Sequence, residues 1–187
     1  MSSSSVLLKI ALLGDGAVGK TSLRKQYMGQ GFHTSHNMTI GADFANLKKE
    51  YPATTINYQV WDLAGQQRFQ SMRSRFYNGM QGGLCVFDIN RLDSFKSLNG
   101  WIEELWRHNG KGVVPITILG NKSDLRGKNS ISVKDIEKYV NSLDEKAKEY
   151  NFSVKFLETS AKTGLNVDEA FETLGRQIMK RSFNVEI

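Results

Sequence analysis

The chain of 187 residues has one cysteine, Cys85, and therefore cannot form an internal disulfide bond. That cysteine lies in the apolar run Gly83-Leu84-Cys85-Val86-Phe87, which is typical of a buried strand rather than of a reactive thiol. No stretch approaches the roughly 20 apolar residues that a membrane-spanning helix requires. The start, Met1 to Ser5, lacks the charged region of a signal peptide. We therefore expect a cytoplasmic protein without a transmembrane segment.

Charge is also not concentrated in any one segment. The 25 basic and 19 acidic side chains give a net charge of +6, but the lysines and arginines are scattered along the chain. A dense basic tract, or basic residues interleaved with aromatic ones, would indicate nucleic-acid binding, and neither occurs. The balance indicates a solvated basic surface and no nucleic-acid partner. The length predicts a single domain over residues 1–187.

Short apolar runs alternate with amphipathic stretches, as in an α/β fold with a mainly parallel sheet. Strands are expected at 6–13, 43–50, 55–62, 83–89, 116–120 and 154–157, and helices at 20–28, 94–108, 132–150 and from Asn166. Only residues 52–54 separate the second and third strands, too few for a crossover helix, so these strands should form an antiparallel hairpin. The pattern predicts a six-stranded, mostly parallel sheet with one antiparallel strand and helices on both faces.

Each later helix carries one apolar stripe, which predicts core packing rather than a cofactor site. The stripes comprise Phe95, Leu98, Ile102 and Leu105; then Val133, Ile136, Val140, Leu143, Ala147 and Tyr150; and finally Val167, Phe171, Leu174 and Ile178. Asn166 and Glu169 are expected to form a pair similar to a capping box at the start of the last helix.

The strongest motif is Gly14-Asp15-Gly16-Ala17-Val18-Gly19-Lys20-Thr21, followed by Ser22, between a predicted strand and a predicted helix. Its spacing, glycine, four residues and then Gly-Lys-Thr, is that of a phosphate-binding loop. The glycines let the backbone N–H groups surround the phosphates, and the helix N-terminus adds partial positive charge. Lys20 supplies a charge to the terminal phosphates, and the Thr21 hydroxyl is a ligand for Mg²⁺. The motif predicts a nucleoside triphosphate site and leaves the base open.

A second segment, Asn121-Lys122-Ser123-Asp124, identifies the base. It follows a predicted strand and so lies at the carboxyl edge of the sheet, where ligands bind in such folds. An aspartate there accepts two hydrogen bonds from the N1–H and 2-amino group of guanine, a pair of donors that adenine lacks, which allows about 10⁴-fold discrimination. A third segment, Glu158-Thr159-Ser160-Ala161-Lys162, follows the last strand and is expected to line the other side of the base.

With these three segments in this order, the chain resembles a small GTPase of the Ras superfamily, nearest the Rab-type branch, over roughly residues 6–180. The segment Trp61-Asp62-Leu63-Ala64-Gly65-Gln66-Gln67-Arg68-Phe69 is similar to the Asp-x-x-Gly-Gln second switch of that family, and Thr39-Ile40-Gly41-Ala42-Asp43-Phe44 resembles the Rab-type first switch. The resemblance implies a P-loop NTPase G domain.

The resemblance also implies residue roles. Thr39 is expected to bind Mg²⁺ directly, and Asp62 is expected to hold the ion through water. The N–H groups of Thr39 and Gly65 are both expected to sense the γ-phosphate. Gln66 is expected to orient the attacking water, with Gly16 leaving room for it. Further expected contacts are Phe32 on the guanine edge, Lys122 along the base, the Ala161 N–H at guanine O6, and Ser160 and Lys162 beside them.

Several positions depart from the family pattern. His36 stands where the family usually has a tyrosine that closes over the nucleotide, so a closure that depends on pH is a hypothesis here. His33 and His36 have no third ligand beside them in the sequence and do not suggest a metal site. Leu63 and Gln67 replace threonine and glutamate, and the stretch from Asp124 to Ser160 is longer than usual. Ser2 excludes N-myristoylation, and residues 183–187 contain no cysteine for prenylation. Either a lipidated tail lies beyond this sequence, or membranes are reached in another way or not at all.

The resulting expectation is a monomeric switch that binds GTP or GDP with Mg²⁺ and hydrolyses GTP slowly. Only 18 residues separate Lys20 from Thr39, which leaves no room for an inserted domain that supplies an arginine. Effectors, exchange factors and GTPase-activating proteins are the expected partners. By analogy with the Rab-type branch, we expect a role in membrane traffic and therefore include peripheral association with membranes. One alternative is a scaffold that binds guanine nucleotides without hydrolysing them. Another is an ATP-dependent kinase or motor, against which the Asp124 motif argues.

Overall fold

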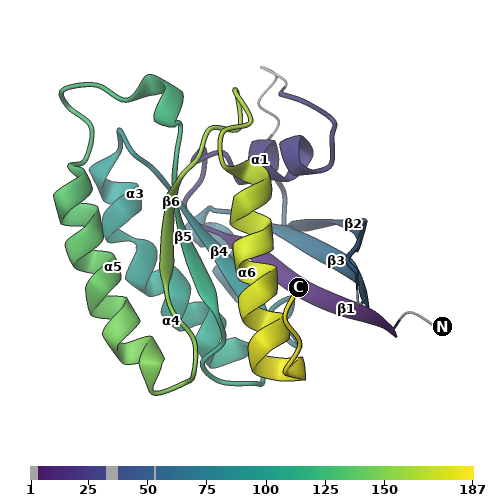
Figure 1. Ribbon diagram of the computed structural model, residues 1–187. Coiled ribbons are helices and arrows are strands. Elements are labelled where there is room, and N and C mark those ends of the chain that lie inside the picture. Colours follow the sequence, from purple (N-terminus) through teal and green to yellow (C-terminus); the bar gives the residue numbers. More distant parts are fainter. Residues whose placement is uncertain (1–3, 33–37, 53) are drawn as a thin grey trace.

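A six-stranded sheet forms the centre of the protein (Figure 1). The computed structural model describes residues 4–32, 38–52 and 54–187. The strand order is β2-β3-β1-β4-β5-β6; β2 and β3 are antiparallel, and all other neighbours are parallel. The strands are β1 Ser4–Leu13, β2 Ala42–Glu50, β3 Thr54–Leu63, β4 Gly82–Asp88, β5 Ile116–Asn121 and β6 Lys155–Glu158. The predicted sheet is confirmed.

Helices cover both faces of this sheet. In Figure 1, α1 and α6 lie on one face, and α3, α4 and α5 lie on the other. The helices are α1 Lys20–Tyr27, α2 Gln70–Arg73, α3 Leu92–Lys96, α4 Leu98–His108, α5 Val133–Lys148 and α6 Val167–Phe183, with 3₁₀ helices η1 Gln67–Phe69 and η2 Ser123–Leu125. The short helices η1 and α2, in the segment after Gln66, were not predicted.

The two-sided core explains why the second half of β1 is a continuous apolar run. Along β1, Leu8, Ile10 and Leu12 pack in the cluster under α1 and α6. Ala11 and Leu13, which point the other way, pack in the cluster under α4 and α5. All five side chains are fully buried. A strand covered on both faces has no polar side, which is the usual pattern of a central parallel strand.

The β2–β3 hairpin forms as predicted. Its pairing runs from Ala42 opposite Leu63 to Glu50 opposite Thr55. The Tyr51 N–H donates to the Thr54 carbonyl oxygen over 2.8 Å and closes the turn. This hairpin places β3 beside β1, so the end of β3 reaches the same sheet edge as the end of β1.

Two expectations about the helices at 94–108 and 132–150 are wrong. The helix expected at 94–108 forms as two helices, α3 and α4, which meet at Ser97, whose backbone stays in the right-handed helical region (φ −72°, ψ −12°). Its hydroxyl oxygen lies 2.7 Å from the Asp93 carbonyl oxygen. In α5, Val133 and Tyr150 are each 42% exposed, because they lie at the first residue and beyond the last turn. The inner four residues of that stripe are buried, as expected.

The expected capping pair of Asn166 and Glu169 does not form. Asn166 has a left-handed backbone (φ 53°), and its side chain donates to the Glu158 carbonyl oxygen over 2.8 Å instead of accepting from the helix. The Glu169 carboxylate accepts from Thr173 and Arg176. The helix begins at Val167, and the asparagine fastens the preceding loop to β6.

A glycine in α6 allows the helix to approach β3 closely. A Cβ atom at Gly175 would lie 2.1 Å from the Tyr58 hydroxyl oxygen, and Tyr58 is fully buried. We predict that Gly175→Ala lowers the free energy of unfolding by about 1–3 kcal/mol through overpacking. Gly100→Ala in α4 is the matched control, because no atom lies within 4 Å of its Cβ position. In urea denaturation, the free energy of unfolding of the control should lie within about 1 kcal/mol of the parent value or above it. An equal loss of this free energy in both variants would contradict the overpacking explanation.

Candidate functional site

The functional cavity lies at the carboxyl edge of the parallel strands and has a volume of about 920 Å³. This volume is sufficient for a nucleotide-sized ligand. Sixteen predicted site residues line the cavity: Gly16, Ala17, Gly19, Lys20, Thr21, Ser22, Phe32, Thr39, Asp62, Gly65, Gln66, Asn121, Lys122, Asp124, Ala161 and Lys162. Gly14, Asp15, Val18 and Ser160 do not line it but bond to residues that do. His33 and His36 lie outside the described residues.

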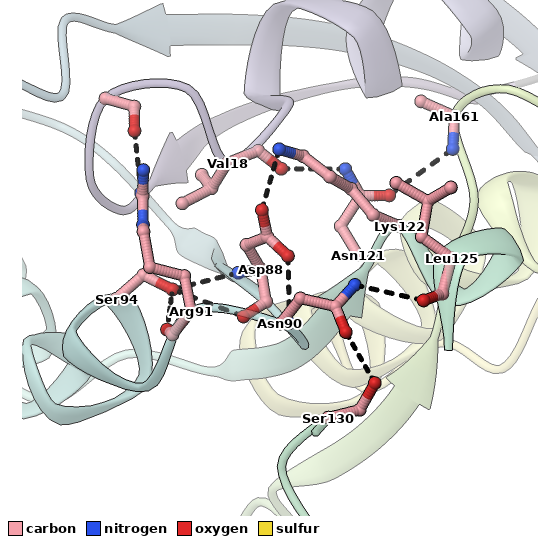
Figure 2. Close-up of polar contacts among 11 residues, drawn as sticks. Val18, Asp88, Asn90, Arg91, Ser94, Asn121, Lys122, Leu125, Ser130 and Ala161 are labelled. Carbon is pink, nitrogen blue, oxygen red and sulfur yellow. Dashed lines mark hydrogen bonds and ion pairs between the residues drawn. The ribbon is translucent and has the colours of Figure 1, made fainter. Parts of the chain in front are cut away.

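The loop between β1 and α1 requires glycine at two positions. Gly14 (φ 135°) and Gly19 (φ 101°) have backbone angles that other residues rarely adopt. A Cβ atom at Gly14 would lie 2.0 Å from the Val86 carbonyl oxygen, and one at Gly19 would lie 2.3 Å from Asn121 Nδ2. That same Asn121 amide donates to the Val18 carbonyl oxygen over 2.8 Å (Figure 2). The loop is therefore packed directly against β4 and β5.

Lys20 lies inside this loop with 6% of its surface exposed. Its Nζ donates to the carbonyl oxygens of Gly14 (2.6 Å) and Asp15 (2.8 Å). Burial lowers the pKa of Lys20 to about 8, although the negative charges of Asp62 and Asp15 oppose this shift. A buried ammonium group of this kind gains most from an added negative charge, such as that of a phosphate.

Three oxygen atoms meet beside Lys20. Thr21 Oγ1 lies 2.5 Å from Asp62 Oδ2 and 3.0 Å from Thr39 Oγ1, and Thr39 Oγ1 lies 3.5 Å from the same carboxylate oxygen. Asp62 is 1% exposed, and its Oδ1 accepts no hydrogen bond from the described residues. Burial raises the pKa of Asp62. One buried carboxylate and two hydroxyls are the oxygen donors that a hard cation such as Mg²⁺ prefers, so the residues fit this ion.

At the other end of the cavity, the loops after β5 and β6 are fastened together. Asn121 Oδ1 accepts from the Ala161 N–H over 3.3 Å, and Asp124 Oδ1 accepts from the Ser160 hydroxyl over 2.6 Å. Lys122 has a left-handed backbone (φ 66°), and its Nζ pairs with Asp88 over 2.7 Å (Figure 2). The two segments predicted to hold the base therefore form one structural unit.

The second switch segment lies against the phosphate-binding loop. Gln66 Cγ would be 3.7 Å from a Cβ atom at Gly16, and the Gln66 side-chain amide donates to Met38 Sδ. A methyl group at Gly16 therefore makes ordinary contact in this arrangement rather than a clash. Phe32 lines the cavity and also packs against the cluster under α1 and α6. Leu63 is fully buried, and Gln67 is exposed.

Sequence reasoning missed four supporting residues. Asp88 pairs with Lys122, and Arg91 donates to the Gly16 carbonyl oxygen over 2.7 Å (Figure 2). Arg73 and Trp101 contact the second switch and the phosphate-binding loop. Asp88 had a detectable signal, because, like Asp62, it is a carboxylate that ends a buried strand. The other three depend on tertiary contacts between segments far apart in the sequence.

A parallel sheet with a glycine-rich loop, a buried lysine and a cluster of hydroxyl and carboxylate oxygens defines a P-loop nucleotide-binding protein. Comparison with known proteins narrows this class. The family profile described as "Ras family" matches residues 9–180. "Ras-related protein Rab7" of Pisum sativum is 38% identical, with 97% of this chain and 86% of the relative covered.

Two further relatives agree. "Ras-related protein RABG3f" of Arabidopsis thaliana is 37% identical, over 97% of this chain and 86% of its own length. "Ras-related protein Rab-8" of Diplobatis ommata is 38% identical, over 94% and 79%. The chain belongs to the Ras family and is a Rab-type small GTPase, a GTP-hydrolysing switch. Members of this family bind GTP and GDP and generally use Mg²⁺. In the described part of the chain, no helix is long and apolar enough to cross a membrane.

The pKa of Lys20 predicts how nucleotide affinity depends on pH. Bound phosphates favour the charged lysine and raise its pKa, so binding at or above pH 8 takes up a proton and weakens as the pH rises. With a pKa of about 8 in the free protein, GDP affinity should fall about fourfold between pH 7.0 and 8.5. Calorimetry in two buffers with different ionisation heats measures both the GDP affinity and the number of protons taken up on binding. Lys20→Arg stays charged and should lose the proton uptake; equal uptake in both proteins would exclude Lys20 as its source.

The Asp88–Lys122 pair predicts an effect on nucleotide release. Asp88→Asn keeps the acceptor for the Asn90 N–H but removes the charge that holds Lys122. We expect GDP to dissociate about three to ten times faster, which corresponds to about 0.7–1.4 kcal/mol, the net contribution of one typical hydrogen bond. Displacement of a fluorescent GDP derivative measures this rate. Asp93→Asn changes an exposed carboxylate nearby and should have no effect; unchanged release from the Asp88 variant would contradict this role.

Proposed function

We propose that this cavity binds GTP and GDP together with Mg²⁺ and is the site of GTP hydrolysis. The residues from Gly14 to Ser22 surround the phosphates, with Lys20 on the terminal ones. The observation that carries the proposal is the arrangement of Lys20, the Thr21–Thr39–Asp62 oxygen cluster and Gln66 in one cavity. The motif that suits guanine lines the other end of the same cavity.

We propose that Thr21 and Thr39 bind Mg²⁺ through their hydroxyls and that Asp62 holds it through water. The ion, when bound, neutralises charge on the β- and γ-phosphates. The Thr39 and Gly65 N–H groups contact the γ-phosphate, and their release after hydrolysis loosens both switch segments. The orphaned Asp62 Oδ1 supports this assignment, because a buried carboxylate oxygen without a donor is costly unless a ligand or its water satisfies it.

At the base end, we propose that Asp124 accepts from the guanine N1–H and 2-amino group and that the Ala161 N–H donates to O6. Lys122 lies along the base, and Asn121 ties this loop to the phosphate-binding loop. Phe32, Ser160 and Lys162 complete the surroundings of the base. The Ser160–Asp124 hydrogen bond supports this arrangement, because it holds the carboxylate beside the Ala161 N–H.

In the proposed reaction, Gln66 orients the water that attacks the γ-phosphate, and Lys20 stabilises charge on the transferring group. Arg91, which lies near the phosphate-binding loop, is engaged with the Gly16 carbonyl oxygen. We infer slow intrinsic hydrolysis. An activating protein that supplies an arginine accelerates such reactions by about 10³–10⁵-fold.

We further propose a single-domain, monomeric protein that acts in the cytoplasm and at membrane surfaces. The Rab-type relatives support a role in membrane traffic by analogy. Effectors, exchange factors and GTPase-activating proteins contact the two switch segments. Ile40, Phe44 and Met72 support this surface, since all three apolar side chains are more than 45% exposed there.

Single-turnover phosphate release tests the assignment of the site. Protein loaded with GTP and Mg²⁺ should release phosphate slowly, and Gln66→Ala should reduce the rate at least about tenfold. ATP in place of GTP should give no release, because it cannot pair with Asp124. Gln67→Ala, the exposed neighbouring glutamine, is the matched control and should hydrolyse at the parent rate. Tight GTP binding without release in the parent protein would instead support a scaffold, and equal use of ATP would overturn the base assignment.

A further inference from the structure

Arg73 is a buried arginine that holds the backbone of the second switch segment. It is 2% exposed, and its guanidinium group donates to both carboxylate oxygens of Glu104 over 3.0 and 3.2 Å. The remaining donor, Nη1, bonds to the carbonyl oxygens of Ala64 (3.0 Å) and Gln66 (2.7 Å). The Ala64 carbonyl belongs to the same peptide group as the Gly65 N–H, and the Gln66 carbonyl belongs to the peptide group after Gln66, so a single side chain holds the backbone before Gly65 and after Gln66.

Trp101 of α4 connects this arginine to the phosphate-binding loop. The Arg73 guanidinium lies over its ring, with the carbon atom 4.2 Å from the ring centroid. The edge of the same ring donates from Nε1 to Asp15 Oδ1 over 2.8 Å. The other carboxylate oxygen of Asp15 accepts from the Ser97 hydroxyl over 2.7 Å. One rigid ring thus contacts both segments that flank the site of hydrolysis.

Gly65 brings the backbone of the second switch segment into contact with the phosphate-binding loop. A Cβ atom there would lie 2.4 Å from the Asp15 carbonyl carbon and 2.5 Å from the Gly16 nitrogen. The second switch therefore lies directly on the phosphate-binding loop at residues 15 and 16. Asp15, Trp101, Arg73 and Gly65 form a closed set of contacts, which fixes the distance and orientation between the two segments.

We propose that Arg73 and Trp101 are positioning residues for GTP hydrolysis, which set Gln66 and the Gly65 N–H relative to the phosphate-binding loop. This inference rests on the proposed function of the site. Neither residue lines the nucleotide cavity, so their effect reaches the reaction through the switch backbone and Asp15. The rate of hydrolysis therefore depends on them more strongly than nucleotide affinity does.

Stability alone does not account for this set of contacts. A buried ion pair such as Arg73–Glu104 is costly to desolvate, and apolar residues of similar size often stabilise a protein as well or better. What the guanidinium group adds is direction, because its planar donors fix two carbonyls and a carboxylate at once. An apolar cluster has no comparable hold on the peptide groups around Gly65.

The test uses Arg73→Lys, which keeps the charge without the planar fork, and Trp101→Phe, which keeps a ring without the N–H. Each should slow single-turnover GTP hydrolysis about tenfold to a hundredfold, the scale expected for misplaced catalytic groups. The rate of GDP release should stay within about twofold of the parent. The double variant should be little slower than the worse single variant, because both changes interrupt one set of contacts.

Two matched controls accompany these variants. Arg75→Lys alters an exposed arginine two residues away, and Trp106→Phe removes a tryptophan N–H that donates to the Val114 carbonyl oxygen instead. Both should hydrolyse GTP at the parent rate. Parent-like hydrolysis in folded Arg73→Lys and Trp101→Phe, or an equal loss of GDP affinity, would overturn the proposal. A parent protein that binds GTP without hydrolysing it would instead refute the function on which the proposal rests.

Discussion

The nucleotide cavity exists because β1 pairs in parallel with β3 and β4, β4 with β5, and β5 with β6. Parallel strands end at a common edge, so the loops that follow them meet there although they are far apart in the sequence. The phosphate-binding loop follows β1, the second switch follows β3, and the two segments for the base follow β5 and β6. Burial of both faces of the sheet holds these loops on a rigid support.

Within that frame, the chemistry comes from charges that are held away from water. Burial disfavours the charged form of both Lys20 and Asp62, as the directions of their pKa shifts indicate. Both charges are therefore available to groups of opposite sign: Lys20 to phosphate, and Asp62 to a divalent cation. Lys20 begins the helix that follows β1, and Asp62 lies at the end of the neighbouring strand β3, so phosphate and cation are brought together on the same side of the cavity.

Much of the fold and most of the cavity residues could be predicted from the sequence. Periodicity and the short turn at residues 52–54 gave the strands and the hairpin, and the spacing of Gly14 to Thr21 gave the loop that surrounds Lys20. Local rules failed where tertiary contacts decide. Asn166 resembles a helix cap, but its amide bonds to the Glu158 carbonyl oxygen, and Val133 follows the apolar period although it lies at a helix end. Arg73 and Trp101 have no local signal of their role, because the groups to which they bond lie 7 to 86 residues away in the sequence. Asp88 ends a buried strand, but its pairing with Lys122 is a contact between separate elements that no local pattern predicts.

The switch segments are expected to respond to the γ-phosphate, and hydrogen–deuterium exchange measures this response. Protein with Mg²⁺ is compared when bound to GDP and when bound to a GTP analogue that cannot be hydrolysed. With the analogue, we expect slower exchange of backbone amides in residues 39–41 and 64–73 and unchanged exchange in β1, β4 and β5. Identical exchange of both segments in the two complexes would contradict this expectation.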